Sequence, residues 1–212
     1  MLILYIETNF LMAVAKGQDL KAADLLQDIP SSIRIVIPDV CYIESLTTYR
    51  IDKRKRLEFQ EEMDKQIKEL NRDKTSDYAR FAKLFMGNLG EARINNELLI
   101  NAIQDRLFTT IDQLLNNAEL INLNKNLIQN IAQTTISQPE AWLIKNDIMD
   151  NLILECILDH AQLHPQEDKA FISNNSKDFG KPEIKAVLSN AGIKYFTTTQ
   201  DFLNWFNSLS SI

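Results

Sequence analysis

Short apolar runs alternate with longer amphipathic stretches at both ends of the 212-residue chain. Four runs have the length of a buried strand: Leu2–Ile6, Ile33–Ile37, Ala170–Ser173 and Ile193–Phe196. Stretches with helical periodicity lie between and after them: Asn9–Gln27, Asp39–Tyr49, Asp147–His160, Pro182–Asn190 and Gln200–Leu209, with Thr199 as the expected N-cap of the last. This alternation predicts a parallel sheet with helices on both faces.

The middle of the chain has a different pattern. No proline occurs between residues 39 and 138, and Gly87 and Gly90 are the only glycines there. Apolar residues such as Ile100, Ile103 and Leu107 recur every three or four positions, which predicts helices. We therefore expect an α/β body, residues 1–49 and 139–212, interrupted by an all-helical insertion, residues 50–138, with a hairpin turn at Gly87–Gly90.

Four acidic residues stand where an α/β fold would bind a ligand. Glu7 closes the first apolar run, Glu44 follows the second, Asp150 opens an apolar stretch of helix, and Asp178 follows the third run. Residues just after buried parallel strands gather at one edge of the sheet. Converging carboxylates without balancing Lys or Arg repel each other unless a cation joins them, so the pattern indicates a divalent-metal site.

The same segments resemble the PIN domain, a family of metal-dependent nucleases. "LILYIETNFLMAVAKG" is similar to its opening strand, acid-Thr-Asn signature and first helix, and "IVIPDVCYIESLTTY" to its second strand and second-acid helix. "NDIMDNLILECILDHA" resembles its third-acid helix, and "KAFISNNSKDF" its late strand and polar loop. The resemblance covers the body but not the helical insertion. It implies a three-layer, Rossmann-like fold and the use of Mg²⁺ or Mn²⁺.

Carried over position by position, the resemblance implies these metal-binding residues: Glu7, Glu44 and Asp150, with Asp178 or Asn175 as the fourth. Asp147 is either the N-cap of the helix that carries Asp150 or an additional ligand. Thr8 or Asn9 is expected to form a hydrogen bond within the site.

Two positions depart from the family pattern. The first acid is usually Asp, and the extra methylene of Glu7 moves its carboxylate by about one bond length. Asn175 stands where many relatives have an acid, and an amide oxygen is a weaker, neutral ligand. Asp178 is the residue that would compensate for it.

Charge is distributed unevenly along the chain. The net charge is −6, but residues 50–138 hold 14 basic and 13 acidic residues, so the body carries −7. Five basic residues cluster at the start of the insertion: Arg50, Lys53, Arg54, Lys55 and Arg56. They either hold phosphates or form an ion-paired helix face with the acids that follow, and the i,i+4 pair Arg54–Glu58 favours the second. The acidic body should repel RNA away from a bound metal, so any phosphate contacts are expected from the insertion.

Other features narrow the class of protein. No stretch of 18 apolar residues occurs and no basic region precedes the first apolar run, so we expect no membrane span, no signal peptide and a cytoplasmic location. Cys41 and Cys156 are expected to be buried, reduced thiols. His160 and His164 are four residues apart and form a candidate metal pair, but Pro165 follows them. We favour histidines that interact with the dipole of a helix C-terminus.

These features together predict an Mg²⁺- or Mn²⁺-dependent endoribonuclease that hydrolyses phosphodiester bonds in RNA. The resemblance, rather than the residues, supplies RNA as substrate, and it suggests the toxin of a toxin–antitoxin pair, with an antitoxin or homodimer partner. One alternative is a flap-type DNA nuclease, since acids alone do not read the 2′-OH. Another is a PIN-like binding or assembly protein without catalysis, which the departures at Glu7 and Asn175 would explain.

Overall fold

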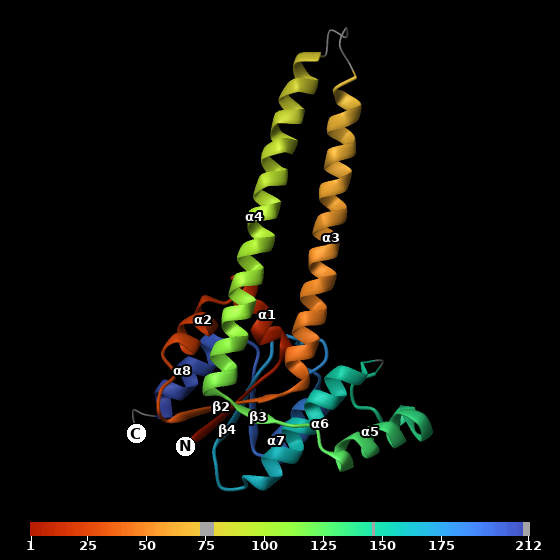
Figure 1. Ribbon diagram of the computed structural model, residues 1–212. Coiled ribbons are helices and arrows are strands. Elements are labelled where there is room, and N and C mark those ends of the chain that lie inside the picture. Colours follow the sequence, from red (N-terminus) through yellow and green to blue (C-terminus); the bar gives the residue numbers. More distant parts are fainter. Residues whose placement is uncertain (73–78, 146, 210–212) are drawn as a thin grey trace. The chain divides into compact units, whose positions relative to one another are not determined.

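The computed structural model describes residues 1–72, 79–145 and 147–209. It divides into a sheet unit, Met1–Ser45 with Leu107–Ile212, and a hairpin unit, Leu46–Arg106. The sheet unit holds five strands: β1 (Leu2–Ile6), β2 (Ile33–Pro38), β3 (Glu119–Ile121), β4 (Lys169–Ile172) and β5 (Ile193–Phe196). All neighbouring strands are parallel, in the order β3-β2-β1-β4-β5, which confirms the predicted α/β class (Figure 1).

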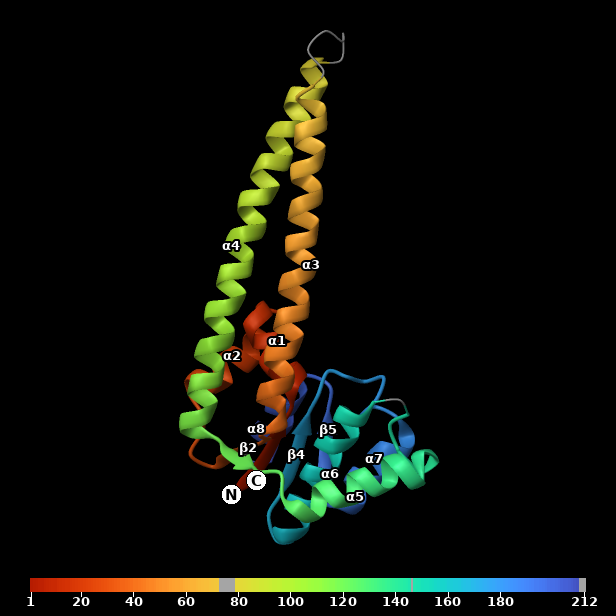
Figure 2. The ribbon, with the colours of Figure 1, turned by 45° about the vertical axis from the view of Figure 1, so that its right-hand side comes forward.

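Helices cover both faces of this sheet, so the unit has three layers (Figures 1 and 2). One face carries α1 (Thr8–Lys16), α2 (Leu20–Gln27) and α8 (Thr199–Leu209). The other carries α5 (Lys125–Ser137), α6 (Ile148–Leu163) and α7 (Pro182–Asn190). Because both faces are covered, the strands can be apolar along their whole length, as β1 is.

The order of the strands places a topological switch point between β1 and β4. The chain continues from β1 to its neighbour β2 on one side, whereas β4 continues to β5 on the other side. The carboxyl ends of two such strands are where open α/β sheets bind ligands. Glu7 directly follows β1, and Ser173 directly follows β4.

The first predicted helix is two helices. The stretch Asn9–Gln27 breaks at Gly17, which ends α1 in the left-handed conformation with a φ of 67°. Glycine adopts this conformation without the steric cost of a Cβ atom. Asp19 then begins α2 by accepting a hydrogen bond from the backbone N–H of Ala22.

The predicted cap of the last helix is also corrected. Thr198, not Thr199, caps α8, because its hydroxyl oxygen accepts from the backbone N–H of Asp201 at 3.1 Å. Thr199 is buried and donates to the carboxylate of Asp19 at 2.7 Å. Thr199 therefore ties the start of α8 to the start of α2, two helices on the same face of the sheet.

Part of the predicted all-helical insertion, residues 50–138, belongs to the sheet unit. Residues 119–121 form β3, in which Glu119 pairs with Val36 of β2. Leu127 of α5 is buried in the same core as the sheet. A strand of three residues is too short to show a period-two pattern, so this edge strand left no signal in the sequence.

The predicted turn at Gly87–Gly90 is wrong. Both glycines lie inside α4 (Ala79–Asn117), the second long helix of the chain. A Cβ at either position would meet nothing within 4 Å, so neither glycine is required by packing or by a turn. Glycine in an exposed helix costs roughly 1 kcal/mol, which the long run of helix-forming neighbours outweighs.

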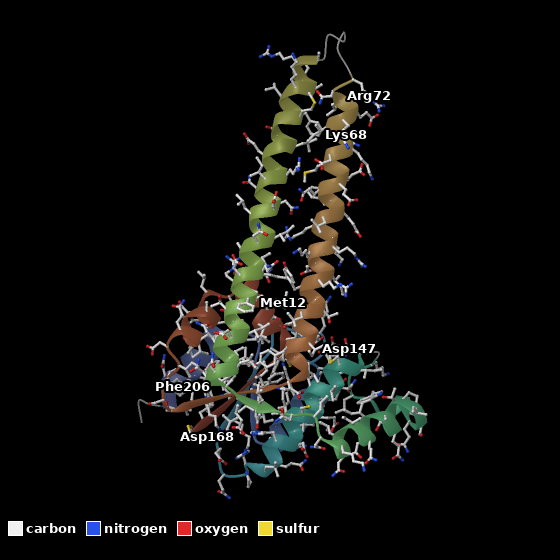
Figure 3. The ribbon with its side chains drawn as sticks, in the orientation of Figure 1. Met12, Lys68, Arg72, Asp147, Asp168 and Phe206 are labelled. Carbon is white, nitrogen blue, oxygen red and sulfur yellow. The ribbon has the colours of Figure 1, made fainter. Side chains whose placement is uncertain are left out.

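The hairpin unit is built from the C-terminal part of α3 (Val40–Leu70) and the N-terminal part of α4. Met63 on α3 and Ile100 and Ile103 on α4 are buried. Arg56 and Asn96 join the two helices, since the Asn96 side chain donates to the Arg56 carbonyl at 3.1 Å and accepts from its guanidinium at 3.3 Å. Many other side chains on both helices project outward (Figure 3).

Two further expectations concern the thiols and the membrane. Cys41 and Cys156 are both free and buried, as predicted. No helix within residues 1–72, 79–145 or 147–209 is both long and apolar enough to cross a membrane.

The centre of the sheet gives a stability prediction. Phe171 of β4 is fully buried and meets Phe179 edge to face, with ring centroids 5.1 Å apart. Phe171→Ala should lower the free energy of unfolding by about 3–5 kcal/mol, because it leaves a cavity in a packed core. Urea denaturation followed by circular dichroism measures the loss. Phe108→Ala is the control, since Phe108 is 75% exposed; an equal loss in both variants would contradict this core.

Candidate active site

Glu7 occupies the junction between β1 and α1. It is the N-cap of α1, where its carboxylate accepts from the backbone N–H of Asn9 at 2.6 Å. The side chain is only 1% exposed, and its Oε1 has no hydrogen-bond partner among the described residues. A buried carboxylate oxygen without a donor is costly unless a proton or a cation meets it. The position of Glu7 thus fits two roles, the cap of a helix N-terminus and a metal ligand.

Glu44 lies in the first turns of α3 and contacts the residue that follows Glu7. The hydroxyl of Thr8 donates a short hydrogen bond to Glu44 Oε2. This contact confirms the expectation that Thr8 or Asn9 bonds within the site. It also links the second predicted acid to the end of β1.

Asp147 and Asp150 stand at the start of α6. Asp147 is its N-cap and accepts from the backbone N–H of Asp150 at 2.9 Å. Asn151, buried beside them, fixes this end of the helix, since its amide accepts from Ile144 N–H and donates to the carbonyls of Ile144 and Asp147. Asp150 is 6% exposed and is therefore held in place by the helix start and by burial.

The loop after β4 supplies the remaining candidates. The side-chain amide of Asn175 donates to Asp150 Oδ2 at 2.8 Å, and Asn175 N–H donates to Ser173 Oγ. Asp178 forms an ion pair with Lys181 at 3.0 Å. Position 180 at the end of this loop requires glycine, because a Cβ there would overlap the carbonyl oxygen of Ser176. The sequence analysis missed Ser173, Lys181 and Gly180, although Lys181 is three residues after Asp178, the spacing of a local ion pair.

Burial, more than mutual repulsion, shifts the pKa values of these carboxylates. Burial raises the pKa of Glu7 to about 8, and Asp150 and Glu44 add to the effect, while the Asn9 N–H and Ser173 oppose it. Burial likewise raises the pKa of Asp150 to about 7, with further contributions from the negative charges of Asp147, Glu44 and Asp178.

Burial also raises the pKa of Glu44, helped by Asp147 and opposed by the hydrogen bond from Thr8. The structure therefore brings the six predicted site residues into one electrostatic neighbourhood, which we call the acidic site: Glu7, Glu44, Asp147, Asp150, Asn175 and Asp178. Within the described parts of the chain, no Lys or Arg forms an ion pair with Glu7, Glu44 or Asp150. Without a cation, Glu7 holds its proton at neutral pH and Asp150 is protonated for part of the time.

The donors of the acidic site fit a hard divalent cation. All but the amide of Asn175 are carboxylates, and Glu7 Oε1 has no hydrogen-bond partner in the part of the chain that the structure describes. Across the described residues, no three of these carboxylates offer oxygens within 4.8 Å of one another; the group that meets this limit is Glu119 with His160 and His164. The wider spacing suits Mg²⁺, which keeps several waters and binds directly to one or two carboxylates.

A family model for the PIN domain matches residues 4–179. The chain belongs to the PIN domain family. The match begins in β1, ends just after Asp178 and encloses the hairpin unit. Searches of curated proteins and of solved structures gave no match.

PIN domains are generally nucleases, and they generally use a divalent metal. Membership therefore makes this chain a nuclease-type domain whose substrate is a nucleic acid. In this PIN domain the switch point between β1 and β4, where ligands bind in open α/β sheets, coincides with the buried acids.

The raised pKa values predict how stability depends on pH when metal is removed. The pKa is about 8 for folded Glu7 and about 7 for folded Asp150, whereas in an unfolded chain both ionise near pH 4. Between these values the folded state binds more protons than the unfolded state. The stabilisation that comes from these two protonated groups is therefore full below about pH 4 and is lost as the pH rises through the folded pKa values. Each group contributes up to about 1.4 kcal/mol per pH unit.

Urea denaturation in EDTA at a series of pH values from 5 to 8 measures this slope. Asp150→Asn should flatten it, because one titrating group and its repulsion of the others are removed. Asp159→Asn is the matched control, since Asp159 is exposed on the same helix. A wild-type slope no steeper than that of Asp150→Asn would contradict the prediction that Glu7 and Asp150 hold protons in the folded state.

Proposed function

We propose that this PIN domain is an endoribonuclease that hydrolyses RNA phosphodiester bonds with Mg²⁺ or Mn²⁺. The observation that supports it best is the acidic site at the switch point, in which buried carboxylates lack cationic partners. Glu7, Glu44 and Asp150 are the proposed ligands, with Asp147, Asn175 and Asp178 completing the site. A divalent ion held by these residues would activate water and offset the charge that develops on the phosphate.

The chain's own residues orient these ligands. Thr8 holds Glu44 through Oε2, and Asn175 holds Asp150 through Oδ2, so each carboxylate keeps its other oxygen for the ion. Asp147 uses an oxygen to cap α6. Asp178 is partly neutralised by Lys181, so we assign it a weaker, outer role. The amide of Asn175, which donates to Asp150, acts as a positioning group.

The hairpin unit is the proposed source of phosphate contacts. It contains 13 basic and 11 acidic residues, whereas the sheet unit contains 10 basic and 18 acidic residues. Arg50, Lys53 and Arg54 line a hollow of about 460 Å³ on α3. Arg54 is paired with Glu58 at 3.6 Å, but both side chains are largely exposed, and such a pair contributes little. Arg56 is engaged with Asn96 and is better regarded as structural.

One alternative is supported by a particular residue of the acidic site. Glu7 replaces the usual Asp and, with a pKa near 8, keeps a proton that a ligand must lose, which favours a PIN-like binding or assembly protein with reduced catalysis. A flap-type DNA nuclease would use the same acids. A toxin role would add an antitoxin or homodimer partner, and a small gene encoded beside this one would favour it.

The activity prediction concerns Asp150. Asp150→Asn should lower divalent-dependent RNA cleavage by more than about 100-fold, because loss of a proposed ligand should exceed the effect of losing a residue that only orients one. Cleavage of labelled RNA and of DNA of the same sequence, each with Mg²⁺ or Mn²⁺, measures it. Asp159→Asn should retain activity. Wild-type cleavage by Asp150→Asn would remove Asp150 from the site, and cleavage of DNA alone would favour the flap-type nuclease.

The variant Glu7→Gln separates a nuclease from a scaffold. If Glu7 is a ligand, the neutral amide should abolish cleavage while the protein remains folded by circular dichroism. If wild type and Glu7→Gln are equally inactive on RNA and DNA with either ion, the reduced-catalysis alternative stands. Full activity in Glu7→Gln would make Glu7 a helix cap only, with a contribution of about 1 kcal/mol or less.

A second prediction tests the hairpin unit. Replacing Arg50, Lys53 and Arg54 together by Gln should weaken RNA binding and flatten its dependence on salt by about two to three counterions. Fluorescence anisotropy at several salt concentrations gives this slope. Lys65→Gln with Lys68→Gln is the control for loss of charge elsewhere on α3. An unchanged slope in the triple variant would mean that this face does not contact phosphates.

A further inference from the structure

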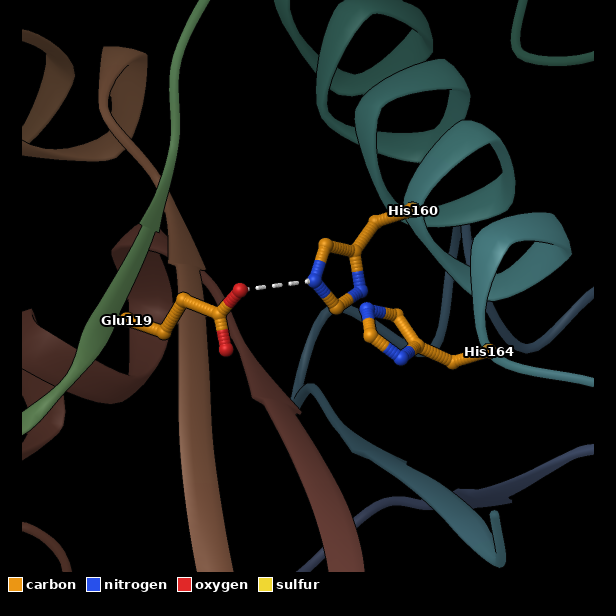
Figure 4. Close-up of side chains that lie close together, drawn as sticks. All are labelled: Glu119, His160 and His164. Atoms are coloured by element: carbon orange, nitrogen blue, oxygen red, sulfur yellow. Dashed lines mark hydrogen bonds and ion pairs between the residues drawn. The ribbon is translucent and has the colours of Figure 1, made fainter. Parts of the chain in front are cut away.

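Both histidines of the chain lie together on α6, opposite an acid from another element. His160 and His164 stack with ring centroids 4.5 Å apart. Glu119 of β3 faces them, and its Oε1 lies 3.2 Å from His160 Nε2 (Figure 4). One ligand atom from each of the three residues falls within 4.8 Å of the others. We call these residues the histidine cluster.

Each imidazole is already oriented through Nδ1. Tyr5, whose ring is fully buried, places its hydroxyl 2.9 Å from His160 Nδ1. Glu167 places Oε1 3.3 Å from His164 Nδ1. A histidine that binds a metal through one nitrogen almost always donates the other N–H to an oxygen acceptor. When Nδ1 carries the proton in both rings, the Tyr5 oxygen and the Glu167 carboxylate are such acceptors, which leaves Nε2 of each ring for an ion.

The charge around the cluster also favours a cation. Arg34 pairs with Glu119 Oε2 at 3.3 Å, and its guanidinium lies 3.4 Å from His164 Nδ1, a contact that Nδ1 gives up when its N–H donates to Glu167. Glu119 and Glu167 together outnumber this single guanidinium. Glu119 can offer Oε1 to an ion while Arg34 keeps Oε2, and a ligating carboxylate is commonly hydrogen-bonded in this way.

We propose that Glu119, His160 and His164 bind Zn²⁺, with water as the fourth ligand. Two imidazoles and one carboxylate form a common three-ligand set for Zn²⁺, and neutral imidazole disfavours Mg²⁺. The ligand atoms must approach one another more closely than 4.8 Å, since a tetrahedral Zn²⁺ with bonds near 2.0–2.1 Å separates its ligands by about 3.4 Å. His164 is the C-cap of α6 and is partly exposed, so its side chain is the one free to adjust.

This site is separate from the acidic site. His160 is ten residues beyond Asp150 on α6, a distance of about 15 Å along the helix axis. The bound ion would join α6 to β3, a three-residue edge strand whose only neighbour in the sheet is β2. Its role is therefore to hold the edge of the sheet, and it does not depend on the proposed nuclease activity.

Because the chain has only two histidines, nuclear magnetic resonance of ¹⁵N-histidine-labelled protein observes the site directly. The full chain, free of any polyhistidine tag and stripped of metal, is titrated with ZnCl₂. One equivalent should shift the Nε2 resonances of both imidazoles and raise the melting temperature, whereas MgCl₂ should do neither. Unchanged imidazole resonances at excess ZnCl₂ would overturn the proposal.

Variants locate the ion. His164→Gln should weaken Zn²⁺ binding by more than about 100-fold in calorimetry, since it removes a direct ligand. Asp150→Asn should retain the Zn²⁺-induced shifts at both imidazoles, because it changes only the acidic site. Equal Zn²⁺ affinity in wild type and His164→Gln, or loss of the shifts in Asp150→Asn, would contradict the site. If His164→Gln does not fold, the wild-type resonances still decide the question.

Discussion

The burial of several neighbouring carboxylates, which also repel one another, is the constraint on which the acidic site of the sheet unit depends. Glu7 lies at the end of β1 and Asp150 at the start of α6. Burial raises the pKa of both, Glu44 adds to both shifts, and Asp150 adds to the shift of Glu7. Without a cation, such a cluster is stabilised by protonation, by N–H donors and by helix N-termini. The fold places N–H donors and helix N-termini at the switch point between β1 and β4, and burial favours the protonated acids.

Much of this arrangement could be predicted from the sequence because strand ends and helix starts have local signals. The apolar run before Glu7 and the N-cap position of Asp147 are visible over a few residues, and the structure has both. The family resemblance placed the acids in order, and the match over residues 4–179 confirms the family. Their roles as ligands remain predictions. Hydrogen bonds such as Asn175 to Asp150, which are 25 residues apart, follow from the fold and have no local pattern.

The errors have physical causes. The sequence analysis did not predict β3, because three residues are too few to show the alternating pattern of a strand. This edge strand is stabilised by pairing with β2 rather than by its own sequence. Gly87 and Gly90 were taken as a turn, but a solvent-exposed helix tolerates glycine when its neighbours favour helix. Because β3 was not predicted, Glu119 could not be placed beside His160 and His164. The two histidines at a helix end therefore had no third candidate ligand in the sequence analysis.

The protonated state of the acidic site has a consequence for how any cation enters it. Near neutral pH, burial keeps a proton on the carboxyl of Glu7 and leaves Asp150 protonated for part of the time, so neither group is permanently an anion. Loading is then an exchange in which the incoming charge displaces protons into the solvent. For every proton released, the apparent affinity changes about tenfold per pH unit. A site built in this way couples metal occupancy to the acidity of its surroundings, even though no residue in it is a histidine.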